Sequence, residues 1–550
     1  MKTTGLRVLT AGTLTFSAAA AVHAGTQPYF TPLTQSSAVA PPNHINELNS
    51  PWQAPAGIEQ KNLLSLRAVE ADVNQSIQRA ANAGTQASMF DMLAYDPSGR
   101  YVFIPHETPW GAGVSRHDTQ TQTTELLFAG NQLANVCSSS APGCPQWEFD
   151  FGAFDPARWT PNGTLIAAEE WTGQGRVVEL LQPLAAAPAD PTARAATQGS
   201  QWRVLPIAKV SHEGINFSVK NPGQVIYFID EWNSGSIYRM VLKTPGDYMG
   251  GGQTFVLSVD DFLPSGGDPA ANWNEGSNVN AKRFGAARWV PITEADGNKL
   301  PGRTWDPMAG GPTADPRVQP ATRGGRGAAD EAGGTPYGRP EDMAIGRLAN
   351  GNEVLYVTTT SEQAVISIQI NGPDTAIVRQ FASRQTPKNV GFQPTTGQLD
   401  DPDNLAIDAL GNVYIVEDKP NSGTVGGDVW FARDVDNDGV AESLDHFMSI
   451  QVGGSEATGM VFHPTDPVRF VISVQHPAST DLAQVPDGFG DAVWEFDLTQ
   501  VVPPVCAEPA GAQQAKGGNG QRAMRSCTKA EDFSFVRALQ RARPLSPFNP

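Results

Sequence analysis

Acidic side chains recur at regular intervals along this chain of 550 residues, and carboxylates are the groups that bind divalent and trivalent cations. Each acid precedes a short apolar stretch, a turn rich in Gly, Pro or Asp, and a β-rich run such as Tyr101-Val-Phe-Ile-Pro105. The acids are about 60 residues apart, with one gap about twice as long. They are Asp91, Asp150, Glu213, Glu341, Asp403 and Glu456.

Strand-rich units that repeat without helical periodicity are typical of a β-propeller. We therefore expect an all-β fold with six blades, or seven if the gap between Glu213 and Glu341 holds another unit. Rotational symmetry would gather the acids at one mouth of a central channel. Because crowded carboxylates repel one another strongly in a shielded site, cations must lie among them or the acids must be protonated. The repeat predicts a metal cluster.

One of the acids has an arginine close by in the sequence. In Arg339-Pro-Glu341, the guanidinium is two residues from an expected metal ligand. Arginine binds phosphate or carboxylate oxygens in a bidentate manner, so this pair suits an anion-binding site. A surface ion pair is the alternative.

A separate acidic segment has the pattern of a calcium-binding loop. Asp434-Val-Asp436-Asn-Asp438-Gly439 places oxygens on alternating residues, with a glycine for the sharp turn. The last ligand would be Glu442 or Asp445. We expect a structural calcium site here, and a solvated turn is the alternative.

Charge and the N-terminal residues restrict the partners and the compartment. The net charge of −19 lacks the basic surface that binds nucleic acid or anionic membranes. Residues 1–24 have the charged, apolar and small-residue regions of a Sec-type signal peptide, which predicts a periplasmic or secreted protein without a membrane span. In that compartment we expect local disulfides, Cys137 with Cys144 and Cys506 with Cys527.

The segments outside the repeat complete the expected organisation. Residues 25–85 would form an arm with a covering helix over 63–81, and residues 86–500 would form the propeller. Residues 300–338 are rich in Gly, Pro, Ala and Arg, which predicts a mobile loop. Residues 501–550 would be a low-complexity tail held by its disulfide.

From about Asp91 to Asp497 the sequence resembles the PhoX-type alkaline phosphatase family. The residues that carry the resemblance are His106-Glu107, Asn162-Gly-Thr-Leu-Ile-Ala-Ala-Glu-Glu170, Ser211-His-Glu213, Arg339-Pro-Glu-Asp342, Asp401-Pro-Asp-Asn-Leu405, Glu456-Ala-Thr-Gly459 and Gln475-His-Pro477. The resemblance implies a β-propeller that hydrolyses small phosphate monoesters with iron and calcium at the channel mouth. We also expect the protein to be a monomer.

The resemblance also implies roles for individual residues. Glu213, Glu341 and Asp403 would be metal ligands, Glu169 would lie beside the cluster, and Arg339 would bind the phosphate oxygens.

Two departures from the family pattern leave other functions open. Ala168 stands where the family has an iron-binding cysteine before the paired glutamates, and the signal lacks a twin arginine. Both departures favour calcium over iron and weaken the expectation of phosphatase activity, because a missing thiolate lowers iron retention. The alternatives are a calcium-stabilised propeller without catalysis and a calcium-dependent lactonase or esterase with ligands such as Asn404.

Overall fold

The computed structural model of the chain describes most of the residues between the two ends. The described ranges are residues 28–41, 48–72, 89–137, 144–171, 174–195, 198–262, 283–309, 324–421, 423–477 and 488–501. The expected signal peptide, Cys506, Cys527 and the tail lie outside these ranges.

The described chain is almost entirely β-structure, arranged in five hydrogen-bonded sheets. The first sheet contains β3 (Met89–Phe90), β4 (Ala94–Tyr95), β5 (Tyr101–Glu107), β6 (Gly113–Asp118) and β7 (Thr123–Ala129). The second contains β8 (Phe154–Trp159), β9 (Leu165–Glu169), β10 (Val177–Leu180) and β11 (Trp202–Val204).

The third sheet has nine strands and two arms that join at their outer edges through β16 and β20. The β12 arm runs through β12 (Ile215–Phe217), β13 (Val225–Ile229), β14 (Ile237–Leu242), β15 (Gly252–Val259) and β16 (Gly285–Pro291). The β17 arm contains β17 (Pro340–Arg347), β18 (Glu353–Thr359), β19 (Ala364–Ile370) and β20 (Thr375–Ser383).

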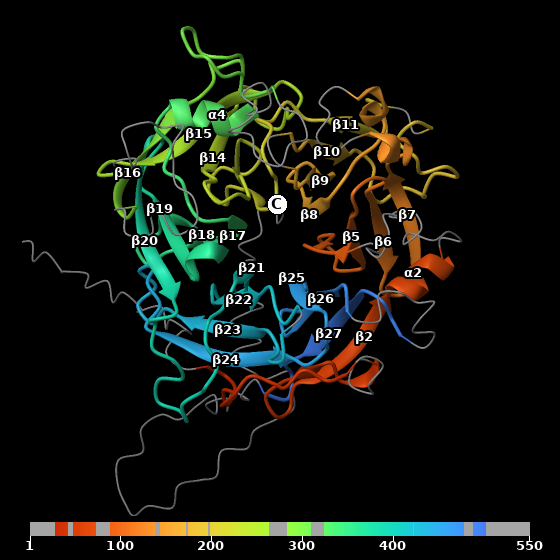
Figure 1. Cartoon of the computed structure of the whole chain (residues 1–550), viewed down its shortest axis with the longest axis vertical. Helices are drawn as coiled ribbons and strands as arrows, with labels where there is room; N and C mark the ends of the chain where they lie inside the picture. Colours follow the sequence, from red (N-terminus) through yellow and green to blue (C-terminus); the bar gives the residue numbers. More distant parts are fainter. Residues whose placement is uncertain are drawn as a thin grey trace, which may run out of the picture.

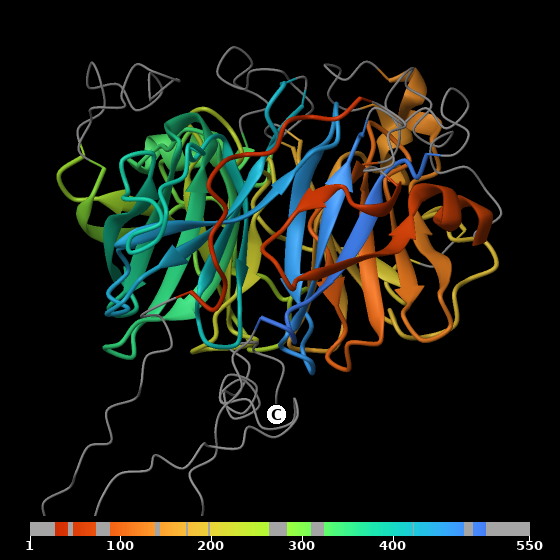
Figure 2. The same cartoon turned by 90° about the horizontal axis from the view of Figure 1, so that it is seen from below.

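The N-terminal arm completes the two remaining sheets from outside, as strands paired to their outer edges. The fourth sheet is β21 (Pro402–Ile407), β22 (Val413–Glu417), β23 (Asp428–Arg433), β24 (Ser443–Ile450) and β1 (Trp52–Gln53). The fifth is β25 (Glu456–Phe462), β26 (Arg469–Gln475), β27 (Ala492–Asp497) and β2 (Glu59–Ser65). Figure 2 shows the red N-terminal segment crossing the blue strands.

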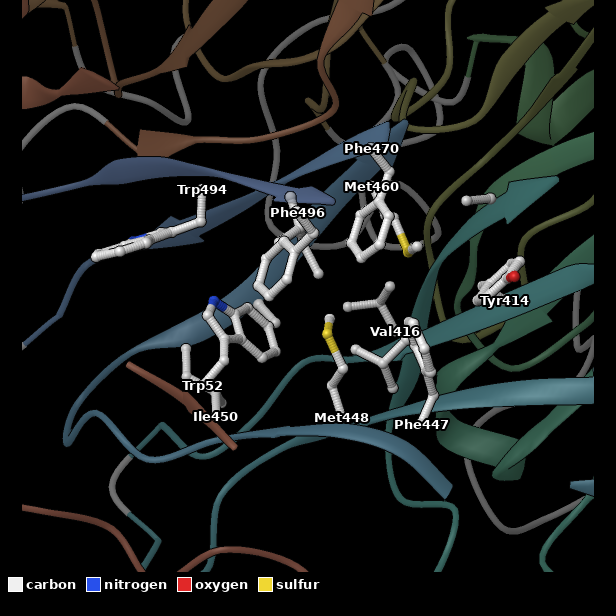
Figure 3. Packing of buried hydrophobic residues seen from close by; sticks show 14 of the residues in the cluster. Trp52, Tyr414, Val416, Phe447, Met448, Ile450, Met460, Phe470, Trp494 and Phe496 are labelled. Carbon is white, nitrogen blue, oxygen red and sulfur yellow. The ribbon is translucent and has the colours of Figure 1, made fainter. Parts of the chain in front are cut away.

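The sheets stand side by side around a common centre, which is a propeller-like arrangement (Figure 1). Strands such as β18, with the sequence Glu-Val-Leu-Tyr-Val-Thr-Thr, are buried on both faces because each sheet packs between two others. Between the fourth and fifth sheets, Trp52, Phe447 and Phe496 belong to one apolar cluster (Figure 3). The N-terminal arm therefore helps to hold the last two sheets together.

Two expectations about the peripheral segments are corrected. The expected helix over 63–81 begins later, because Leu63 to Ser65 belong to β2 and α2 spans Leu66–Asp72. Part of the expected loop over 300–338 is the helix α4 (Gly324–Glu331), despite three glycines. Tertiary contacts outweigh its poor helix propensity: the buried Arg326 pairs with the Asp230 carboxylate at 2.5 Å.

Short helical turns in the described ranges include η2 (Leu133–Val136), η3 (Pro145–Glu148) and η7 (Thr360–Glu362). None of the helices in the described ranges has the length and apolar character needed to cross a bilayer.

Candidate metal centre

The strands nearest the centre begin with an irregularity that redirects their side chains. In β8, β17 and β21 the pairing register shifts directly after the first residue, namely Phe154, Pro340 and Pro402. A β-bulge rotates the side chains that it contains. Asp155, Glu341 and Asp403 are at or within these bulges, so acids from different sheets can turn towards one another.

The residue two positions before each of these three acids has a left-handed backbone. The φ angles are 46° at Ala153, 50° at Arg339 and 44° at Asp401. Non-glycine residues rarely adopt this conformation, and such strain is concentrated at functional sites. The same local geometry therefore recurs in three units, each time two residues before an acid that joins an acidic group.

Three of the predicted ligands meet in one group. Carboxylate oxygens of Glu213, Glu341 and Asp403 lie within 4.8 Å of one another, although they come from the two arms of the third sheet and from the fourth sheet. Burial, and next the neighbouring carboxylate of Glu341, raise the pKa of Glu213 and of Asp403. Glu213 Oε2 and Asp403 Oδ1 have no hydrogen-bond partner within the described ranges. We call this set the inner group.

Arg339 lies beside the inner group at the boundary with solvent. Its Nη2 is 3.0 Å from Glu341 Oε1, and its Nε donates to Glu231 Oε1 at 2.6 Å. The side chain is 37% exposed, in contrast to the buried Glu213 and Glu341. The charge of Glu341 is the main cause that raises the pKa of Arg339 above its ordinary value. A partly exposed guanidinium held by two carboxylates therefore lies beside the inner group.

A second acidic group lies in the first two sheets. Oxygens of Asp91, Glu107 and Asp155 are within 4.8 Å of one another. We call these residues the outer group. Glu170 is close to both groups: burial, then the charges of Glu231, Glu107 and Glu341, raise its pKa.

The donor set of both groups fits hard cations. It consists of carboxylate oxygens, which calcium prefers, and several of these oxygens are buried without a partner in the described chain. A thiolate is missing at the expected place, because Ala168 is fully buried in an apolar cluster with Ile166 and Val177. Cys137 and Cys144 cannot replace it, since they form the predicted disulfide. The residues therefore fit calcium better than thiolate-bound iron.

Comparison with known proteins now places the chain in a family. The family model "Alkaline phosphatase PhoX" matches residues 190–478, which is more than half of the chain. The chain belongs to the PhoX alkaline phosphatase family. The matched segment of this PhoX family member contains the whole inner group and Arg339, whereas the outer group precedes it. No curated protein matches the chain in sequence.

The chain also aligns with solved structures, at low sequence identity and low TM-scores. A gluconolactonase from Xanthomonas campestris aligns at 11% identity and a TM-score of 0.36, over 86% of this chain and 98% of that one. Regucalcin, a calcium-binding protein from Agrobacterium tumefaciens, aligns at 9% identity and a TM-score of 0.30, over 74% of this chain and 89% of that one.

Two predicted ligands, Asp150 and Glu169, have other partners, and a third, Glu456, pairs with a histidine. Asp150 is a loop anchor, because its carboxylate accepts N–H groups of Gly111, Ala134 and Phe151 at 2.8–2.9 Å. Asp155 takes its place at the centre. The sequence signal that identifies Asp155 is the aromatic residue before it, since Phe154-Asp155 matches Phe90-Asp91.

Glu169 is occupied by another partner, whereas Glu456 has a histidine partner and lies near the outer group, because its charge, after burial, raises the pKa of Glu107. The carboxylate of Glu169 binds Arg176 through both oxygens, at 2.6 and 2.7 Å. Successive side chains point to opposite sides in an extended chain, so Glu170 approaches the groups instead. Glu456 pairs with His476 Nε2. Burial opposes the imidazolium, but the hydrogen bond and charge of Glu456 outweigh it and raise the pKa of His476 to about 9.

The predicted calcium loop has a compact form. Oxygens of Asp434, Asp436, Asp438 and Glu442 lie within 4.8 Å of one another. The structure places Glu442 in this group. The alternative last ligand, Asp445, is buried and pairs with Arg433 at 2.9 Å.

An arginine that the sequence analysis missed links several sheets across the centre. Arg158 follows Asp155 by three residues on β8. Its Nη2 is 3.0 Å from Asp342 Oδ1, and its Nε donates to the carbonyl of Ile215 at 3.2 Å. The other Asp342 oxygen accepts the N–H of Leu405 at 3.0 Å. One side chain thus connects the second sheet with both arms of the third and, through Asp342, with the fourth.

Replacing Arg158 with methionine is expected to lower the free energy of unfolding by about 3–5 kcal/mol, because Asp342 would remain buried without its cation. Urea denaturation of the full chain in EDTA measures this change. Arg288→Met is the control, since Arg288 pairs with Asp260 on the surface with 62% of its side chain exposed. If Arg158→Met lowers the free energy of unfolding by less than about 1 kcal/mol, the contacts of Arg158 do not stabilise the fold appreciably.

Proposed function

We propose that the protein is an exported, metal-dependent phosphatase that hydrolyses small phosphate monoesters at the inner group. The observation that carries the proposal is Arg339, a partly exposed guanidinium 3.0 Å from Glu341, beside buried carboxylate oxygens that lack partners in the described chain. A site with this composition combines an anion-binding group with a place for cations.

The charge of the site explains why cations are needed for a phosphate ester. Glu213, Glu341 and Asp403 would repel a dianionic phosphate group, and Arg339 alone carries one positive charge. Bound metal ions would supply the remaining charge and would lower the pKa of a water nucleophile. Calcium suits the oxygen ligands, and the apolar surroundings of Ala168 make retention of iron weaker.

In the proposed mechanism, the acids of the inner group and Arg339 have different roles. Glu213, Glu341 and Asp403 would hold the cations. Arg339 would bind oxygens of the phosphate group, and its contacts with Glu231 and Glu341 would fix the guanidinium before substrate arrives. Preorganised charge of this kind stabilises the developing negative charge without the cost of reorientation.

Two finer features of the fold and its compartment are part of the proposal. We count the two arms of the third sheet as separate blades, which gives six blades in all. The disulfide between Cys137 and Cys144 supports an oxidising compartment outside the cytoplasm, in agreement with the proposed signal peptide.

Hydrolysis of p-nitrophenyl phosphate by the purified protein with added calcium and iron tests the proposal. We expect turnover that EDTA lowers by at least ~100-fold and that calcium restores, because the phosphate group cannot approach the bare carboxylates. Lactones and aryl esters serve as a substrate panel for the same purified protein. Turnover of these compounds but not of the phosphate ester would replace the proposal by a lactonase or esterase function.

A further inference from the structure

Half-buried tryptophans follow the acids at the inner ends of three neighbouring parts of the fold, namely the first sheet, the second sheet and the β12 arm. Most other described tryptophans are buried in the apolar clusters between sheets. A tryptophan that keeps part of its ring exposed has a large, rigid surface for binding, which the buried ones lack. We call the three residues the aromatic rim. They are Trp110 after Glu107, Trp171 after Glu170 and Trp232 after Glu231.

Backbone hydrogen bonds bring the three loops of the aromatic rim together. The N–H of Ala153 donates to the carbonyl of Thr108 at 2.6 Å, and the N–H of Glu170 donates to the carbonyl of Ala153 at 2.8 Å. Ser211 continues this line, because it forms a β-bridge with Glu170 and accepts the N–H of Glu231 at 2.9 Å. Each tryptophan stands one or two residues beyond this line. The three therefore belong to one continuous side of the centre.

The aromatic rim adjoins the arginine that we assign to the phosphate group. The N–H of Arg339 donates to the carbonyl of Trp232 at 2.9 Å, and its Nε donates to Glu231 at 2.6 Å. Its Nη2 faces Glu341 of the inner group. A leaving group on a phosphate held by this guanidinium therefore has the loop of Trp232 as a neighbour. One part of the Trp232 ring is already in use, because the Arg326 guanidinium lies 4.9 Å from the ring centre.

Trp171 is held in place by a second tryptophan and by a glycine. The ring centres of Trp171 and Trp147 are 4.4 Å apart, in an edge-to-face arrangement with an angle of 74°. Trp147 is itself anchored, since its carbonyl accepts Nη1 of Arg176 at 2.8 Å. A Cβ added at Gly152 would lie 2.4 Å from Trp171 Cζ2, so a larger residue there would collide with the indole. The ring of Trp171 is therefore a preformed surface.

We propose that the aromatic rim determines substrate specificity by binding a planar leaving group of the phosphate monoester, such as an aryl or nucleoside group. The inference rests on the proposed phosphatase function and adds the substrate class. Aromatic side chains stack on planar rings without requiring a particular hydrogen-bond pattern. We assign the stacking to Trp171, because Arg326 already covers part of Trp232. Esters with an aliphatic leaving group, such as glycerol 2-phosphate, would lack this contact.

Kinetics with two phosphate esters test the role of Trp171 in the calcium-loaded, full-length protein. In Trp171→Leu, KM for phenyl phosphate should rise by ~5–30-fold with kcat nearly unchanged, because stacking binds the ground state and the transition state equally. KM for glycerol 2-phosphate should stay the same. Trp171→Phe should recover most of the affinity for phenyl phosphate, since it keeps an aromatic ring.

Calorimetric titration with two phosphonates, which are not hydrolysed, measures the same preference without turnover. The wild type should bind phenylphosphonate at least ~5-fold more tightly than methylphosphonate, and Trp171→Leu should lose this difference. Trp305→Leu is the matched control. Trp305 is also half-buried, but it packs against the apolar cluster that contains Ile166 and Tyr238, so its replacement should leave the preference intact.

The two assays separate the rim from the proposed phosphatase function. A wild type that binds both phosphonates equally would overturn the inference, whichever variants fold. An unchanged KM for phenyl phosphate in Trp171→Leu, or an equal rise in KM for both esters, would overturn it as well. A wild type that hydrolyses no phosphate ester but prefers phenylphosphonate through Trp171 would contradict the phosphatase and support the rim.

Discussion

Replacing Arg339 with methionine is expected to lower kcat/KM for phosphate monoesters by ~10²–10³-fold, because the variant loses the guanidinium that we assign to the phosphate oxygens. Arg339→Lys should recover part of this loss, since lysine keeps the charge but not the planar pair of donors. Steady-state kinetics with p-nitrophenyl phosphate measure both effects. Calcium content should remain unchanged in both variants.

The structure offers a matched control for the arginine variants. Arg288→Met removes a guanidinium of the same protein from an exposed surface pair with Asp260 and should leave kcat/KM unchanged. Equal activity of Arg339→Met and wild type would show that phosphate does not bind at this arginine.

Replacing Glu213 with glutamine is expected to change activity and stability in opposite directions. Phosphatase activity should fall at least ~100-fold, because a cation loses one of its ligands. In EDTA, the free energy of unfolding should rise by about 1–3 kcal/mol, because the variant removes one charge from a buried group whose members repel each other. Burial, followed by the charges of Glu341 and Asp403, already raises the pKa of Glu213. Urea denaturation in EDTA and in calcium measures the stability change.

The same substitution at Glu353 is expected to lower stability and to leave activity unchanged. Glu353 is also buried, but its carboxylate accepts hydrogen bonds from the Ser218 hydroxyl, the Lys220 N–H and the Tyr227 hydroxyl at 2.8–3.0 Å. Glu353→Gln would place an amide N–H₂ among donors and should cost about 1–3 kcal/mol with activity unchanged. Destabilisation of Glu213→Gln in EDTA by a similar amount would refute the idea of a crowded, cation-holding group.

Local sequence signals singled out all three acids of the inner group, which the structure brings together. Each β-rich run predicts a strand from its alternating or continuous apolar residues, and the turn before it marks where the next inner strand begins. Glu213, Glu341 and Asp403 stand at these starting points, which is why repeat logic brought them together. Arg339 was found through its distance of two residues from Glu341.

Repeat spacing did not identify the central acid where the choice between two nearby acids depends on which way their side chains point. Asp150 and Asp155 both follow the repeat closely enough to be the ring acid, and only the bulge after Phe154 turns Asp155 inward. Glu169 and Glu170 are adjacent acids, and the pairing of Glu169 with Arg176 assigns the two opposite roles. A one-residue difference in a strand reverses the side, so spacing alone could not choose.

The sequence by itself determined that the chain is a strand-rich repeat protein with acids at the start of its inner strands and an arginine beside one of them. These features are local, because they depend on periodicity and turn residues. Only the tertiary structure decided which acids lie together, that Gln475 joins Asp91, and that Arg158 spans the centre to Asp342. Such contacts join residues hundreds of positions apart, and their partners are chosen by bulges and by packing between sheets, which no local pattern records.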